Sequence, residues 1–215
     1  MICVFEPEPV LQALGEFGLV IGSQSVQPNT GACHAIVDFD NAYLEIVWAE
    51  EGKTPFADEP RLHMVDRILL TQTGWSPFGL SFRPSKGSNP QVPIRTWDYS
   101  AAFLPEGAVP IPIGANHECP NEPLVIVSLF SGRPDERPDR HLLQANRAFG
   151  EITAVRVHLS DDSSPSKELT ILDEKLPWLQ IDSGGESHHV CLEIDERSSG
   201  EHHDFSPILP LSISW

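Results

Sequence analysis

An imidazole, a phenol and a carboxylate fall on one face of a predicted β-hairpin, as His34, Tyr43 and Glu45. Glu45 lies diagonal to His34 across the two strands, and diagonal neighbours are ~7–8 Å apart, within reach of long side chains or through a water. Ile36 lies directly opposite Glu45 and adds an apolar contact. This face predicts either the polar wall of a pocket or the solvated outer face of an antiparallel sheet, which commonly alternates in the same way.

The hairpin itself follows from the alternation of residues 31–39 and 42–49 about a tight turn at Asp40-Asn41. A two-residue turn fixes the register, so successive side chains sort onto opposite faces. The second face is entirely apolar and holds Cys33, Ala35, Val37, Phe39, Ala42, Leu44, Ile46 and Trp48. We expect this apolar face to form the packed core.

The elements before the hairpin give the order β-α-β-β-β. They are a strand at Ile2–Phe5, a helix at Pro9–Phe17 with apolar residues at helical spacing, and a strand at Gly18–Val26. The 20 prolines favour short strands and rigid connections over a helical bundle. The fold class predicted is therefore α+β.

Further along the chain, short strands alternate with occasional helices. Helices are predicted at Leu62–Thr73, at about 141–148 and at Ser164–Leu172. Strands are predicted at 78–83, 94–99, 109–113, 123–130, 152–159, 179–181 and 189–194. Residues 50–61 and 131–140 are predicted to be surface loops or linkers.

Composition excludes several function classes. The net charge of −17, with only 14 basic residues, argues against nucleic acids and against an anionic membrane surface as partners. No apolar run approaches the ~20 residues of a membrane span, and the N-terminal residues do not resemble a signal peptide. The four cysteines are scattered without a CxxC pair, which favours a cytosolic protein with reduced thiols over a disulfide or zinc framework.

Other candidate residues have simpler interpretations. Trp97 is expected to pack in the core, with a pocket-lining role as the alternative. The pairs His188-His189 and His202-His203 are expected to be solvated on the surface, because neighbours on a strand point to opposite faces and cannot chelate together. Neither a nucleophile elbow nor a phosphate-binding loop is present.

Several segments resemble a glyoxalase-like branch of the vicinal oxygen chelate superfamily. The resemblance lies in GLVIGSQSVQPNTG, WSPFGLSFRP, IRTWDYSAAFLPEG, NEPLVIVSLF and HDFSPILPLSISW, and most specifically in NAYLEIVW at Asn41–Trp48. It spans nearly the whole chain. It implies paired βαβββ modules with curved mixed sheets around a shared cavity, into which the face with Glu45 would look.

In many members of that superfamily a divalent metal is held by a His on the first strand of a module and a Glu on the fourth. Glu45 falls on the matching fourth-strand position, but the matching first-strand His is absent. The second module offers neither ligand at the corresponding positions in PFGLSFR and LVIVSLF. One carboxylate does not hold a metal, so we expect no cofactor.

Three functions follow in order of preference. The first is a protein that binds a small organic molecule between its modules without a complete metal site, through His34, Ile36, Tyr43, Glu45 and Trp97. The second is a metal-dependent lyase, isomerase or dioxygenase, with Zn, Ni, Mn or Fe and with Glu45 as ligand or general base. The third is a structural or assembly protein with a filled pocket.

The predicted organisation is one compact domain in three parts. A first module covers residues 1–50, a connecting helix and second module cover 51–140, and an appended C-terminal α/β unit covers 141–215. The sequence leaves open whether the chain forms a homodimer.

Overall fold

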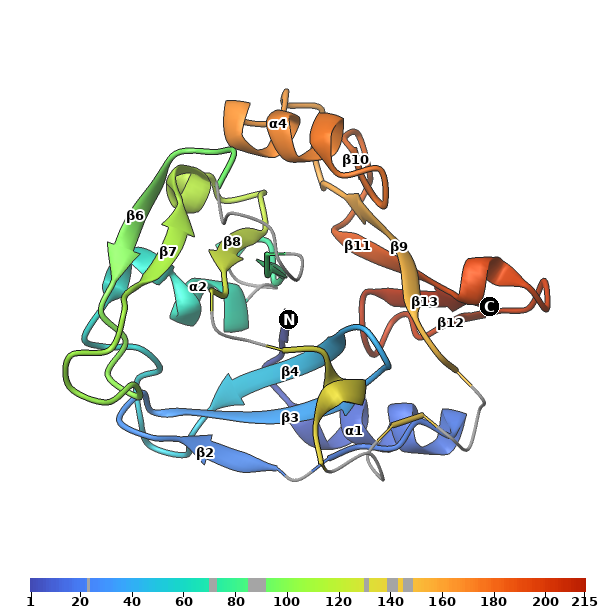
Figure 1. Cartoon of the computed structure of the whole chain (residues 1–215), viewed down its shortest axis with the longest axis horizontal. Helices are drawn as coiled ribbons and strands as arrows, with labels where there is room; N and C mark the ends of the chain where they lie inside the picture. Colours follow the sequence, from blue (N-terminus) through green and yellow to red (C-terminus); the bar gives the residue numbers. More distant parts are fainter. Residues whose placement is uncertain (23, 70–72, 85–91, 130–131, 139–142, 145–148) are drawn as a thin grey trace.

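The described part of the chain is α+β, as predicted, with three mixed sheets and few helices. A computed structural model describes residues 1–215 except 23, 70–72, 85–91, 130–131, 139–142 and 145–148 (Figure 1). In this part no helix has the length and apolar character needed to cross a membrane.

The first sheet contains the predicted hairpin. Its elements are β1 (Ile2–Cys3), α1 (Pro7–Phe17), β2 (Ser25–Gln27), β3 (Ala32–Asp38) and β4 (Tyr43–Ala49). The strand order is β1-β4-β3-β2, with β1 parallel to β4 and the other pairs antiparallel. Helix α1 ends at Gly18, whose φ of 100° is the left-handed conformation that glycine adopts without steric cost.

The predicted register of the hairpin is confirmed. Val37 pairs with Leu44 and Ile36 with Glu45, as a two-residue turn requires. The apolar face is the packed one, since Ala35, Val37 and Ile46 are fully buried. Period-2 patterning and the turn together were sufficient to orient every side chain of these two strands.

The second sheet repeats the strand order of the first. It consists of β5 (Gly79–Phe82), β6 (Thr96–Tyr99), β7 (Ile111–Gly114) and β8 (Leu124–Val127), ordered β5-β8-β7-β6. As in the first sheet, its first and last strands are parallel neighbours.

The helix predicted at Leu62–Thr73 is shorter than expected. A 3-10 turn at Pro60–Leu62 is followed by α2 (Met64–Ile68). His63 separates the two with φ of 52°, a left-handed conformation that a continuous right-handed helix cannot contain. Residues 70–72 of the prediction lie outside the described part.

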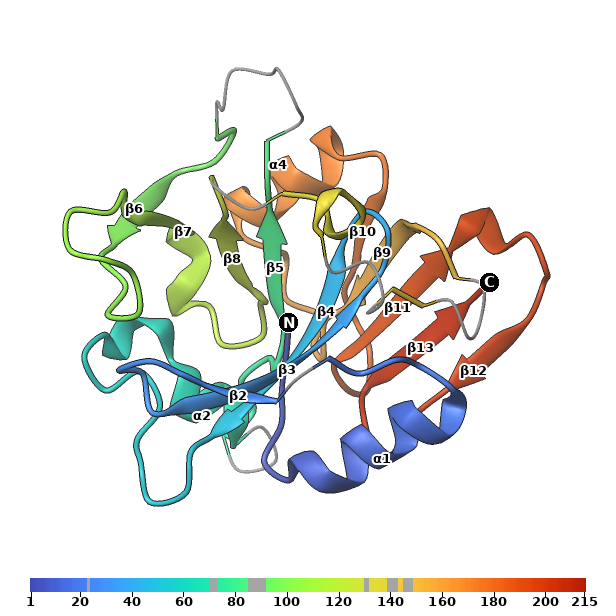
Figure 2. The ribbon, with the colours of Figure 1, turned by 60° about the horizontal axis from the view of Figure 1, so that its bottom comes forward.

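The first and second sheets join through β1 and β5. Cys3 donates its backbone N–H to Pro77 O at 2.8 Å, and Gly79 donates to Met1 O at 3.0 Å. Ile2 forms an antiparallel bridge with Phe78. The eight strands therefore follow one another as a curved wall, which Figure 2 shows around the residue marked N.

The third sheet belongs to the C-terminal part of the chain. Its elements are β9 (Ile152–His158), α4 (Lys167–Lys175), β10 (Leu179–Asp182), β11 (His189–Ile194), β12 (His202–Asp204) and β13 (Leu211–Ser214). The strand order is β10-β9-β11-β13-β12. Helix α4 begins later than predicted because Ser166 caps it, accepting from Leu169 N at 3.2 Å.

The predicted surface solvation is confirmed for His202-His203 and wrong for His188. His202 and His203 are exposed on strand β12, where His203 stacks on Phe17 with ring centroids 4.6 Å apart. His188 is 5% exposed. Its burial arises from packing with residues distant in sequence, such as Phe78. The helix predicted at 141–148 falls mostly outside the described residues.

Two hydrophobic clusters hold the sheets together. The larger joins the apolar face of the first sheet and α1 to the inner face of the third sheet and to α4. The smaller lies between the first two sheets and is filled by residues of the 60–69 segment, such as Leu62, Met64 and Ile68. The side chains of the larger cluster do not fill all the space between the sheets, and the cavity that remains is the candidate site.

Candidate functional site

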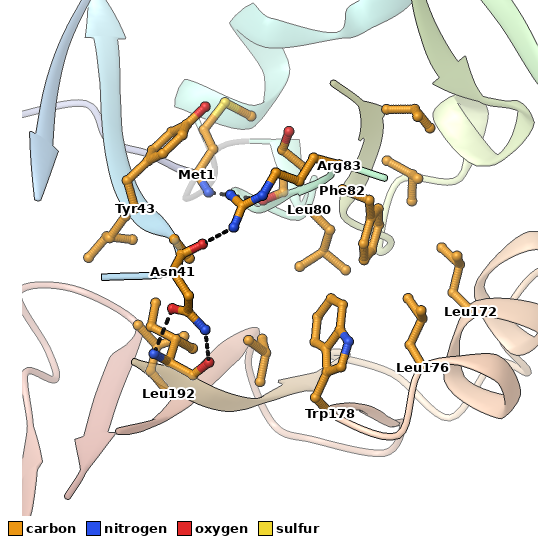
Figure 3. Close-up of a pocket in the computed structure, with 18 of the residues that line it drawn as sticks. Met1, Asn41, Tyr43, Leu80, Phe82, Arg83, Leu172, Leu176, Trp178 and Leu192 are labelled. Carbon is orange, nitrogen blue, oxygen red and sulfur yellow. Dashed lines mark hydrogen bonds between the residues drawn. The ribbon is translucent and has the colours of Figure 1, made fainter. Parts of the chain in front are cut away.

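A cavity of about 1170 Å³ lies between the hairpin tip, β5 and β8, and the C-terminal sheet with α4. Figure 3 shows its aliphatic and aromatic side chains converging from these elements. The apolar wall includes Leu44, Phe78, Leu80, Phe82, Val125, Val127, Val155, Leu172, Leu176, Trp178 and Leu192. Its volume is somewhat above the roughly 300–1,000 Å³ of typical small-molecule sites, and this wall is as apolar as theirs.

Polar groups gather at one end of the cavity. Tyr43, Asn41 and Arg83 lie together there, opposite the wall that holds Trp178 and Leu172 (Figure 3). The guanidinium of Arg83 donates to the backbone oxygen of Asn41, its one hydrogen bond to a described residue. Partial burial, followed by the nearby charge of Arg133, lowers the pKa of Arg83, while the charges of Asp135 and Glu136 act against this shift. No carboxylate of the described residues is hydrogen-bonded to Arg83.

Arg133, the second cation of the cavity, is occupied by carboxylates. It contacts Asp135 through two hydrogen bonds of 3.0 and 2.8 Å and Glu151 at 2.6 Å. The bond to Asp135, and then the bond to Glu151, raise the pKa of Arg133. Arg83 is thus the better placed of the two for an added anion.

The hairpin tip is fixed by bonds that imitate a β-ladder. The Asn41 side chain donates to Ile152 O at 2.8 Å and accepts from Ile152 N at 2.9 Å. Asp40 N donates to Gly150 O at 2.9 Å, and Asp195 accepts from the backbone nitrogens of Gly150 and Glu151, each at 2.9 Å. These contacts dock β9 on the hairpin and so set the width of the cavity.

Asp40→Asn is expected to stabilise the protein by about 0.5 kcal/mol at pH 7, a value reduced for solvent screening. Burial, and then the carboxylates of Asp135, Glu151 and Asp195, raise the pKa of Asp40. A raised folded-state pKa means that the charged form weakens the fold. The gain should therefore exist above that pKa and vanish as the pH falls through it. Urea unfolding of both proteins across this pH range would measure it, and an equal gain at every pH would contradict the explanation.

One of the predicted site residues lines this cavity and four do not. Tyr43 contributes to its polar end. His34, Ile36 and Glu45 lie further along the same sheet face, and Trp97 lies in the smaller hydrophobic cluster with Arg61 3.8 Å above its ring. The face expected to look into a cavity instead packs, at its Val47 end, on the segment that contains α2.

The structure brings His34 and Glu45 together, with a third partner. His34 Nδ1 lies 2.7 Å from Glu45 Oε1, and His34 Nε2 lies 2.8 Å from Ser25 Oγ. The three residues come from neighbouring strands β4, β3 and β2, and Ser25 is the direct cross-strand partner of His34. The hydrogen bond to Glu45 raises the pKa of His34.

These residues do not fit the divalent metal of the vicinal oxygen chelate superfamily. Both nitrogens of His34 already have partners, which leaves Glu45 as a single carboxylate ligand. Among the residues that the structure describes, no three His, Cys, Asp or Glu side chains are grouped as metal ligands. Glu45 alone is too small a ligand set to hold a divalent metal at this position.

Most of the residues that line the cavity could not be predicted from the sequence. Arg83 directly follows β5, within the segment WSPFGLSFRP, but the residues alone gave it no partner. Leu172 and Trp178 belong to the C-terminal unit, and their position depends on how that unit docks. The sequence feature that could have marked Arg83 as a site residue is its position as a lone cation at the end of an apolar strand.

Comparison with known proteins identifies no relative, since no family model, no curated protein and no solved structure matches the chain.

Proposed function

We propose that this chain is a glyoxalase-like protein of the vicinal oxygen chelate type that binds a small organic anion with an apolar body. The ligand would occupy the cavity between the hairpin tip, β5, β8 and α4. The proposal includes paired modules, since the first two sheets share one strand order. It also includes a cytosolic location, in keeping with four cysteines that are free thiols.

The observation that carries this proposal is Arg83, which is hydrogen-bonded to no carboxylate of the described residues, at the polar end of a cavity whose opposite wall is apolar. A guanidinium recognises a carboxylate or sulfonate through paired, charge-assisted hydrogen bonds. Tyr43, beside it, can donate a further hydrogen bond from its hydroxyl. Burial, which is the main cause, and the charge of Glu45 raise the pKa of Tyr43, so the phenol stays protonated at neutral pH.

The apolar body of the ligand would lie against the aromatic rings of Phe82 and Trp178. Their centroids are 5.7 Å apart and their planes are tilted by 41°. Trp178 is 41% exposed although it faces the cavity, so an aromatic ligand can contact it without unfolding its neighbours. Flat aromatic or branched aliphatic acids therefore fit this wall better than sugars or nucleotides.

Two dyes of similar shape and different charge test the proposal. We expect the anionic 1-anilinonaphthalene-8-sulfonate to bind the native protein with micromolar affinity, and Arg83→Met to weaken that binding about 10-fold. N-phenyl-1-naphthylamine lacks the sulfonate, so Arg83→Met should leave its affinity unchanged. Trp178→Ala should weaken both dyes, whereas Trp75→Ala, outside the cavity, should weaken neither. Fluorescence titration gives each dissociation constant.

If Arg83→Met weakened the affinity for both dyes equally, the role of Arg83 as an anion contact would be contradicted. Absence of binding by either dye to the native protein, at concentrations up to the millimolar range, would contradict the binding function itself. The circular dichroism spectrum of each variant, compared with that of the native protein, checks that the fold is retained.

A further inference from the structure

We propose that Ser25, His34 and Glu45 form a serine nucleophile, general base and orienting acid that hydrolyse small activated esters. The hydrogen-bonded series runs from Ser25 Oγ to His34 Nε2 at 2.8 Å and from His34 Nδ1 to Glu45 Oε1 at 2.7 Å. It uses a different part of the molecule from the cavity near Arg83 and does not depend on ligand binding there.

The hydrogen-bond partners of His34 determine which of its two ring nitrogens carries the proton. Glu45 carries a carboxylate, which only accepts hydrogen bonds, so His34 Nδ1 must carry the proton in the bond between them. In the neutral ring Nε2 is then unprotonated and can accept from the hydroxyl of Ser25. This is the arrangement that a serine nucleophile needs, and it is recognised by geometry and roles whatever the fold.

The sheet holds the three side chains rigidly. Ser25 and His34 are direct partners on β2 and β3, and Glu45 lies on β4 opposite Ile36, next to His34 on the same face. Ladder hydrogen bonds fix all three backbones, which is more precise than a site built on loops. His34 and Glu45 have side-chain exposures of 22% and 21%, so the base is shielded and still reachable.

The nucleophile lies where a substrate can reach it. Ser25 is exposed on β2, and β2 is the outermost strand of its sheet, with no strand beyond it in the described residues. Backbone N–H groups of successive strand residues point to opposite sides, so either Ser25 or Val26 directs its N–H to the open edge. Such a group can donate to a developing oxyanion. Half-buried Ile36 offers an apolar contact beside the base.

The reaction is balanced with water as the second reactant. Ser25 Oγ bonds to the ester carbonyl carbon while its proton passes to His34 Nε2. The bond from that carbon to the leaving alcohol oxygen breaks, and His34 returns the proton to the alcohol. Water then attacks the acyl-serine in the same way, giving the carboxylic acid and free Ser25. The open surface around Ser25 favours a short acyl group.

The acylation rate should rise with pH as His34 loses its proton, because only the neutral ring is a base. The hydrogen bond to Glu45 raises the pKa of His34, and Glu45 is the ionisable group responsible for that shift. Partial burial of the ring acts against it. In Glu45→Gln the midpoint of the pH profile should therefore move to lower pH, a change that a purely structural role would not produce.

The test uses p-nitrophenyl acetate and a fluorophosphonate with the full chain. We expect a burst of p-nitrophenol, an acetyl or phosphonyl group on the peptide that contains Ser25, and a loss of about 100-fold or more in Ser25→Ala and in His34→Ala. Ser214→Ala is the matched control, since Ser214 Oγ lies 3.0 Å from His202 Nδ1 in a His–Ser pair to whose ring no carboxylate of the described residues is bonded. It should react like the unmodified protein.

Three results would overturn the proposal. They are unchanged hydrolysis in Ser25→Ala, mass labels on other residues only, and unchanged labelling of Ser25 in His34→Ala. Because Ser25 is exposed on an edge strand, Ser25→Ala should fold normally, which its melting temperature verifies. The dye titrations are read independently, so failure of this site does not affect the binding proposal.

Discussion

Glu122→Ala is expected to lower the free energy of unfolding by about 3 kcal/mol, because three donors would lose a buried carboxylate. Glu122 is 4% exposed and accepts from Asn116 Nδ2 at 2.9 Å, Ser166 Oγ at 2.7 Å and Ser166 N at 2.5 Å. Asn116 lies beside the second sheet, whereas Ser166 caps α4 of the C-terminal unit. The side chain therefore couples two parts of the cavity wall.

Urea unfolding followed by circular dichroism would measure this loss. Glu118→Gln is the matched control, because Glu118 is exposed four residues away and should change stability by less than about 0.5 kcal/mol. Glu122→Gln keeps the shape of the side chain but turns an amide NH2 group toward hydrogen-bond donors. Its loss of unfolding free energy should therefore fall between those of Glu122→Ala and Glu118→Gln. If Glu122→Ala proved as stable as the control, the carboxylate would not be what holds α4 in place.

Asn41→Ala is expected to lower the free energy of unfolding by about 2 kcal/mol, since the amide satisfies both backbone groups of Ile152. The same change frees the start of β9, so it should also weaken dye binding in the cavity that Asn41 lines. Chemical denaturation and the fluorescence titration together measure both effects.

Asn41→Asp separates docking from turn propensity. Aspartate suits a tight turn as well as asparagine, but its carboxylate would meet the backbone oxygen of Ile152 and the acidic side chains of Asp40 and Glu151. Its stability loss should therefore shrink as the pH is lowered. Asn121→Ala is the control, since Asn121 is half-buried and in the described residues bonds only to Asp161 and Ser163. A loss in Asn121→Ala equal to that in Asn41→Ala would contradict the docking role.

Local patterning predicted the strands whose partners are near in sequence. The hairpin was correct in register, and β11 was placed at the observed bounds, because alternating apolar residues and a tight turn constrain them. Strands β12 and β13 were missed as strands. The short polar β12 is a strand only because it pairs with β13, which itself pairs with β11 across a proline-containing segment.

The candidate site was less predictable than the fold. The sequence placed His34 near Glu45, and the structure brings them into hydrogen-bonding distance. Ser25 could not be added, because the turn before β3 did not fix the register of β2. The cavity was expected on the face of Glu45, yet that face supplies only Tyr43 of the predicted residues, and Leu44 lines the cavity from the opposite face. Which face stays open depends on how residues 60–69 and the C-terminal unit pack, and neither is encoded locally.

The aromatic contacts of Phe17 bear on the order in which the chain is made. Phe17 on α1 packs against His203, Phe205 and Trp215, so one side of an early helix is completed by residues that are synthesised much later. At ribosomal elongation rates this delay is on the order of 10–40 s. During that time the apolar side of α1 has no native partner from this segment, and transiently exposed apolar surface of this kind makes nascent chains prone to aggregation.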